Sequence, residues 1–87
     1  MPVVYIPTLL TNLTRGESPI KAKGANVRQL LDSIERAWPG LREALLDQGR
    51  LRTNIRVAVD GRVSPLGLLA PVKPSSEVHF IQAVGGG

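Results

Sequence analysis

One amphipathic segment, between Asn26 and Pro39, constrains the fold more than any other part of the sequence. Its apolar residues recur at i, i+3, i+4, i+7 and i+11, which is the spacing of one face of an α-helix. Asn26 is a good N-cap, and Gln29 stands where the partner of a capping box would lie. The apolar face consists of Val27, Leu30, Leu31, Ile34 and Trp38. We therefore predict one main helix, buried along a single face, with Trp38 as a core residue at its end.

Two hairpins are predicted on either side of this helix. Val3 to Ile6 is rich in β-branched residues and is stopped by Pro7, and Ile20 to Lys23 alternates apolar and charged residues after a polar turn. Ile55 to Val59 also alternates, and Asp60-Gly61 behind it is the strongest short hairpin signal in the chain. Each hairpin contributes antiparallel strands to the predicted sheet.

The remaining segments complete one domain. We predict a short second helix from Leu41 to Gln48, with Gly49 as its C-terminal glycine, and a packed loop or single helical turn between Pro65 and Pro74. The last stretch, 77–84, is apolar on both sides apart from a few polar positions, which suits the middle of a sheet. Together these elements predict an α+β fold, with a mixed sheet of four to five strands covered on one face by the main helix.

Three glycines end the sequence, although they add nothing to packing. We expect a folded domain at residues 1–84 and a flexible glycine tail at 85–87, because glycine has no Cβ and its main chain can lie against another surface. Three extended residues reach about 10 Å, enough to carry the terminal carboxylate into a slot of a partner. There it can be activated as an acyl-adenylate. A frayed end is the alternative explanation, because chain termini are commonly disordered.

The composition excludes several classes of function. The sequence contains no cysteine, which excludes disulfides, thiol catalysis and thiolate metal sites. No apolar run approaches the roughly 18 residues that a membrane helix needs, and no signal peptide is recognised, so we expect a soluble, cytoplasmic protein. The formal charge of +4 favours acidic partners, but a soluble basic surface explains it better than nucleic-acid binding. The single Trp, Tyr and Phe do not interleave with basic residues as base-stacking surfaces require.

Three sets of polar side chains are candidates for a site. His79 is the only histidine, so a position on the surface of a strand is favoured over a metal or catalytic role. Asp32 and Glu35 lie on the predicted outward face of the main helix, where solvation is the ordinary explanation. Four arginines flank the Asp60-Gly61 hairpin in the sequence, and they either steer an acidic partner or serve solubility alone. They are Arg50, Arg52, Arg56 and Arg62.

The order of elements, the Asp60-Gly61 hairpin and the ending Ile81-Gln82-Ala83-Val84-Gly85-Gly86-Gly87 resemble the ubiquitin-like β-grasp sulfur carriers of the MoaD/ThiS family. The resemblance covers essentially the whole chain and implies a ubiquitin-like β-grasp fold. The segments most similar to the cysteine-biosynthesis carrier (CysO) are Ile6 to Leu10 with Thr14 and Gly16, Pro39-Gly40-Leu41, and Asn54 to Val57. An aromatic-rich, Arg-containing segment after the first strand, more frequent in the small subunit of molybdopterin synthase (MoaD), is missing.

The resemblance implies a sulfur carrier rather than an enzyme. An E1-like adenylyltransferase/sulfurtransferase would adenylate Gly87, and sulfur would replace the adenylate as a thiocarboxylate. Val84, Gly85 and Gly86 would bind the partner. The family's usual ending has two glycines, so removal of Gly87 to leave Gly86 as the acceptor is an alternative.

The same resemblance implies the downstream partners. A pyridoxal-phosphate cysteine synthase would accept the sulfur, followed by a metalloprotease that releases cysteine; the alternative acceptor is the large subunit of molybdopterin synthase. ATP, zinc and pyridoxal phosphate would belong to these partners, and the chain itself is expected to bind no cofactor or metal.

Two alternatives of different kinds stay open at this point. A ubiquitin-like modifier would join its terminus to lysines of other proteins without sulfur. A basic nucleic-acid binder would lose affinity steeply with salt and would be indifferent to deletion of Gly86 and Gly87. For a carrier, the sequence does not separate the cysteine, molybdopterin, thiamine and tRNA-thiolation pathways.

Overall fold

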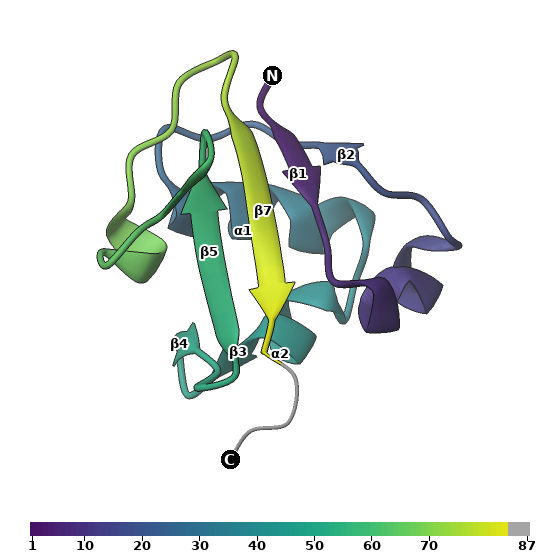
Figure 1. The fold of residues 1–87 in the computed structure, drawn as a ribbon. Helices are drawn as coiled ribbons and strands as arrows, with labels where there is room; N and C mark the ends of the chain where they lie inside the picture. The colour runs from purple at the N-terminus through teal and green to yellow at the C-terminus, as the bar shows by residue number, and fades with distance from the viewer. Residues whose placement is uncertain (84–87) are drawn as a thin grey trace.

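The computed structural model describes residues 1–83, which form a mixed five-stranded sheet with helices on one face (Figure 1). The strand order is β2 (Ile20–Lys21), β1 (Val3–Tyr5), β7 (Glu77–Gln82), β5 (Ile55–Val59) and β6 (Arg62–Val63). Strand β7 runs parallel to β1 and antiparallel to β5. The prediction of a mixed sheet with the last strand at its centre is therefore confirmed.

The main helix, α1 (Val27–Ala37), lies behind the sheet in Figure 1. The side chain of Asn26 accepts a hydrogen bond from the Gln29 N–H at 2.9 Å, which confirms the predicted N-cap. The Gln29 side chain accepts in turn from the Ala25 N–H, one residue before the position that a capping box uses. Trp38 follows the helix and is half-buried against the core.

The core lies between α1 and the sheet. Its members are almost completely shielded from water, and each fully buried aliphatic or aromatic side chain stabilises the fold by about 1.5–3 kcal/mol. The largest contributions come from Val4, Leu30, Leu31, Ile34, Leu41, Leu45, Val57, Val78 and Phe80. Strand β7 supplies Val78 and Phe80 to this core, so the strand that leads to the C-terminus is fixed on its helix-facing side.

The segment from Leu41 to Leu51 differs from the prediction. Helix α2 spans only Leu41–Leu45, and the next residues form a small antiparallel pair, β3 (Leu46–Asp47) and β4 (Arg50–Leu51). Gln48 and Gly49 join the two strands with φ values of 52° and 78°. Positive φ at both central residues is the geometry of a type I′ hairpin turn. The predicted helix to Gln48 is therefore wrong, and Gly49 serves a hairpin rather than a helix end.

Two short 3₁₀ helices complete the part of the chain that the structure describes. The first, η1 (Thr8–Thr14), occupies a stretch that the sequence indicated only as a turn. Buried Thr14 holds its end, because its hydroxyl donates to Glu17 O at 2.6 Å. The second, η2 (Gly67–Leu69), confirms the single helical turn predicted within Pro65 to Pro74. None of the helices in residues 1–83 combines the length and apolar character needed to cross a bilayer.

The Asp60-Gly61 hairpin between β5 and β6 is confirmed, and it also anchors the start of β7. The Asp60 carboxylate accepts hydrogen bonds from the Glu77 N–H at 2.9 Å and from Ser76 Oγ at 2.8 Å. The first of these bonds, assisted by the second, holds the pKa of Asp60 below its ordinary value. The first residue of β7 is thus tied to the β5–β6 turn through both main chain and side chain.

Candidate functional site

Strand β7 leads the chain from the centre of the sheet towards its C-terminus. Beyond the strand, the Ala83 N–H donates to Asn54 O at 2.7 Å, which continues the pairing with the segment before β5. The residues predicted from the sequence to carry and present the reactive carboxylate follow directly. They are Val84, Gly85, Gly86 and Gly87, and all four lie outside the described residues. The acceptor role of Gly87 therefore stays a prediction, as does the division between residues 1–84 and 85–87.

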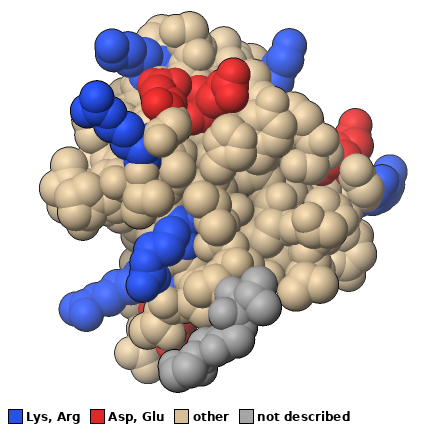
Figure 2. Space-filling model, in the orientation of Figure 1, with Lys and Arg blue, Asp and Glu red and all other residues tan. Residues whose placement is uncertain are grey.

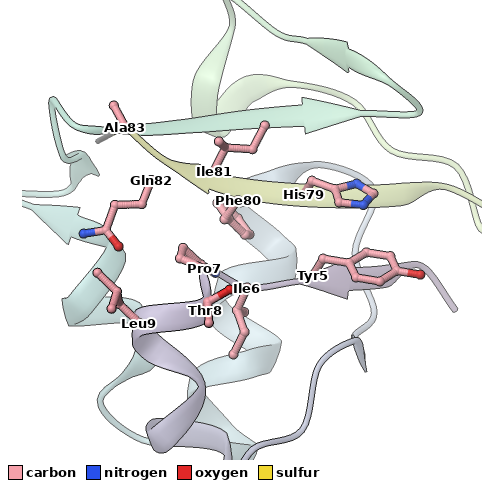
Figure 3. Close-up of a pocket in the computed structure, with 10 residues that line it drawn as sticks. All are labelled: Tyr5, Ile6, Pro7, Thr8, Leu9, His79, Phe80, Ile81, Gln82 and Ala83. Carbon is pink, nitrogen blue, oxygen red and sulfur yellow. The ribbon is translucent and has the colours of Figure 1, made fainter. Parts of the chain in front are cut away.

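A groove of about 540 Å³ runs beside the end of β7, on the side of β1 (Figure 3). Its lining comes from two stretches, 5–9 and 79–83, which contain no Asp, Glu, Lys or Arg. Pro7 and Phe80 are buried, whereas Leu9 and Ile81 are 77% and 44% exposed. Such exposure of two large aliphatic side chains in one groove is typical of a contact surface for another molecule.

Tyr5 and His79 form one end of this groove. They are paired in the parallel register of β1 and β7, and their rings stack with centroids 4.2 Å apart and planes 4° from parallel. His79 is half-buried on the sheet face opposite α1, which confirms the strand-surface position predicted for it. Within residues 1–83, no group of three or more His, Cys, Asp or Glu side chains lies close enough to hold a metal ion.

Gln82 marks the other end of the groove, and its amide points towards Leu9 in Figure 3. The side-chain oxygen Oε1 is buried, and among the described residues it has no hydrogen-bond partner. A buried acceptor without a donor is unfavourable, so such atoms in native proteins call for an explanation. In the sequence, Gln82 stands out only as part of the ending 81–87, because the burial of its side-chain oxygen depends on tertiary packing.

The four arginines do not form the basic area predicted around the Asp60-Gly61 hairpin. Arg62 lies beside that turn, but Arg50, Arg52 and Arg56 lie towards the opposite end of β5. Figure 2 shows basic side chains at the lower left of the sheet face, and others that flank the acidic side chains near its top. Because β5 and β7 are antiparallel, the three arginines share the end of the sheet where β7 leads to the C-terminus. We call Arg50, Arg52 and Arg56, at this end of the sheet, the basic area.

Two of these arginines also have structural partners. The Arg52 guanidinium donates to the carbonyls of Glu43 and Ala44, at 3.0 and 3.1 Å, and Arg56 donates to Thr53 O at 2.8 Å. Arg50 is exposed, and no hydrogen bond or ion pair of its side chain is found within residues 1–83. Among Arg50, Arg52 and Arg56, Arg50 is thus the one whose charged group has no such partner.

Asp32 and Glu35 have partners too, so simple solvation is not their role. The Glu35 carboxylate accepts from the main-chain N–H groups of Gly40 and Arg42 at 3.2–3.3 Å, at the start of α2. Asp32 forms an ion pair with Arg42 at 3.1 Å. These carboxylates join α1 to α2, and the geometry indicates no general acid/base pair.

Comparison with known proteins identifies the family to which this fold belongs. A model of the ThiS family matches residues 4–87, which is nearly the whole chain. The chain belongs to the ThiS family. A search of curated protein sequences found no match.

Solved structures agree with the ThiS-family assignment. The Amycolatopsis orientalis BexX/CysO complex is similar at a TM-score of 0.92 and 34% identity, over 100% of both chains. Mycobacterium tuberculosis CysO is similar at 0.89 and 25% identity, over 97% of this chain and 100% of that one. The small archaeal modifier protein 1 of Methanosarcina acetivorans, at 0.82 and 22% identity over 99% and 95% of the two chains, shows the same ubiquitin-like fold. The expected resemblance and the β-grasp fold are both confirmed.

Proposed function

We propose that this ThiS-family protein is a sulfur carrier whose terminal glycine is converted to a thiocarboxylate. The observation that carries the proposal is the family match, which extends through the final glycines. The fold supports it, because residues 84–87 follow a strand that is paired with β5 and packed on α1. The chain acts as a co-substrate, and the chemistry belongs to its partner enzymes.

The reaction has two steps. The Gly87 carboxylate oxygen attacks the α-phosphorus of ATP, an acyl-adenylate forms and pyrophosphate leaves. Hydrosulfide, or an enzyme-bound equivalent, then attacks the terminal carbonyl carbon and AMP leaves with the original oxygen. The product is a thiocarboxylate, in which one carboxylate oxygen is replaced by sulfur. Trimming to Gly86 before activation gives the same chemistry one residue earlier.

Cysteine biosynthesis is the pathway that we propose for the sulfur. Two similarities support it, 34% identity with a chain of the BexX/CysO complex and 25% with CysO of M. tuberculosis, both over nearly the entire chain. The partners are then an E1-like adenylyltransferase/sulfurtransferase, a pyridoxal-phosphate cysteine synthase and a metalloprotease. ATP, pyridoxal phosphate and zinc belong to those enzymes. A molybdopterin-synthase subunit (MoaD) is the alternative within the same chemistry.

Conjugation to other proteins is the second candidate function. It is favoured by the likeness to small archaeal modifier proteins, which at 22% and 21% identity share the fold. A modifier passes through the same acyl-adenylate, but a lysine amine rather than sulfur accepts the terminal acyl group. The two functions therefore differ in the product and not in the first step.

Reconstitution separates these outcomes. The purified protein is incubated with ATP, sulfide and the host's E1-like enzyme, and its intact mass is measured. We expect the mass gain for one oxygen replaced by sulfur, abolished when Gly86 and Gly87 are deleted. Ladders on a gel with added host proteins, without sulfur in the terminus, would favour conjugation. An unchanged mass with an enzyme that is active on another carrier would contradict the proposal.

A further inference from the structure

Strand β7 has different partners on its two edges. Towards β5, Ala83 N–H donates to Asn54 O and Asp60 N–H donates to Glu77 O. Hydrogen-bonded pairs alternate along an antiparallel ladder, so Ile81 bonds to β5 through its main chain. The main-chain groups of Phe80 and Gln82 therefore point to the opposite edge, where β1 lies.

Strand β1 stops before it can satisfy these groups. Its parallel ladder starts with Val3 N–H donating to Ser76 O and ends where Tyr5 pairs with His79. The next donor along β1 would be residue 7, which is Pro7 and has no N–H. The Pro7 carbonyl accepts from the Leu10 N–H at 2.9 Å and so turns into η1.

The end of β7 is consequently an open strand edge inside the groove. Within residues 1–83, the Phe80 C=O and both main-chain groups of Gln82 make no hydrogen bond outside the strand ladders. The ladder with β1 does not extend to them, because β1 ends at Tyr5. Open edges are templates for a further strand, which natural proteins usually cover or blunt. The buried Gln82 Oε1 is a further unpaired group, on the side chain of the same residue.

We infer that this groove binds an extended main-chain segment of the enzyme that acts on the C-terminus, added to β7 where β1 has turned away. This inference rests on the proposed function. Residues 84–87 span at most about 14 Å when extended, so an enzyme that holds Gly87 must lie next to the groove. Strand addition is a general mode of peptide recognition, in which main-chain bonds supply affinity and side-chain pockets supply specificity.

The lining defines the chemistry of the added segment. It contains no Asp, Glu, Lys or Arg, and Leu9 is 77% exposed, so the segment turns uncharged, apolar side chains towards the groove. A main-chain carbonyl of the segment accepts from the Gln82 N–H, and a donor of the segment satisfies Gln82 Oε1. An acidic segment would find no Lys or Arg in the lining to pair with.

A pair of variants isolates the main-chain bond. Gln82→Pro removes the N–H, which takes no part in the β5 ladder, whereas Gln82→Ala keeps it and is the matched control. Affinity for the E1-like enzyme is measured without ATP. We expect Gln82→Pro to bind about two- to tenfold more weakly than Gln82→Ala, the range for one net hydrogen bond. Equal affinities of the two folded variants would overturn the inference.

Residue-resolved hydrogen exchange tests the same bond without a variant. In the free protein the Gln82 amide should exchange about tenfold or more faster than the amides of His79 and Ile81, and in the enzyme complex it should slow to their range. Protection of Gln82 in the free protein, whether by the chain itself or by a second copy, would overturn the inference. So would an unprotected Gln82 in complex with an enzyme that forms the thiocarboxylate. The mass assay tests the proposed function separately. If it shows no thiocarboxylate, the proposed function itself is contradicted, and the inferred occupant of the groove is lost with it.

Discussion

At the scale of single residues, the Asp60 carboxylate joins a hairpin turn to the start of β7. Its pKa lies below the ordinary value of 3.8, chiefly because the Glu77 N–H donates to it. A lowered folded-state pKa means that the ionised carboxylate stabilises the fold above the unfolded pKa, and that this contribution disappears as pH falls through the folded value. The stability of the protein should therefore decrease from about pH 4 downwards.

Asp60→Asn should weaken this acid dependence, because an amide does not titrate and Asn tolerates the φ of 51° found here. Urea unfolding at pH 7 and pH 3 measures the difference. Asp47→Asn is the control, since Asp47 is exposed and its side chain has no recorded hydrogen bond within residues 1–83. An equal pH dependence of the two variants would contradict the role given to Asp60.

Gly24 illustrates a constraint that the sequence did not reveal. A Cβ at this position would lie 2.7 Å from the main-chain N of Leu30, in the first turn of α1. Gly→Ala at a compatible position stabilises a protein by about 0.4–1 kcal/mol, through the unfolded state. We expect Gly24→Ala to destabilise by about 1–3 kcal/mol instead, because the helix must shift. The sign of the change in unfolding free energy decides between the two.

At the scale of elements, predictions succeeded where local pattern and tertiary packing agree. The apolar residues of α1 have helical spacing and are also buried. Asp60 and Gly61 both have positive φ, a conformation that favours Asp-Gly over most other residue pairs. The segment after Leu41 was mispredicted because its first residues have helical spacing and Gly49 fits a helix end equally well. Leu46 pairs with Leu51, and no local signal in the sequence specified that pairing.

Gln48→Asn distinguishes this hairpin from the helix that the sequence suggested. Asn accepts a positive φ more readily than Gln and is preferred with Gly in type I′ turns, so we expect stabilisation of about 0.5–1 kcal/mol. In a helix the same change would destabilise, because Asn has a lower helix propensity than Gln. Chemical denaturation of the two proteins gives the sign, and a loss of stability would contradict the hairpin.

The basic area at the start of β5 predicts an electrostatic effect on partner binding. Arg50→Glu should slow association with the E1-like enzyme about two- to tenfold at low salt, and the difference should shrink as salt is added. Arg62→Glu makes the same charge change at the other end of β5 and is the matched control. Equal association rates of the two variants, measured by stopped flow, would contradict steering by this area.

At the scale of the whole molecule, the candidate site depends on segments from the two ends of the chain. The three terminal glycines are read directly from the sequence. The central position of the last strand could be predicted, because the pattern of apolar residues along it is a local signal. The groove could not, since it depends on the register of residues 3–5 against 77–79 and on Pro7 ending that ladder. Pro7 was seen to stop a strand, but its consequence for β7 appears only when the two are side by side.

The central claim is that the terminal carboxylate of this protein carries sulfur, and the most direct measurement is the intact mass of the protein purified from its native host. The account predicts a species in which one oxygen is replaced by sulfur, located at Gly87, or at Gly86 if Gly87 is removed. Only the unmodified mass, from cells in which the partner enzymes are active, or the chain found joined to lysines of other proteins, would contradict it.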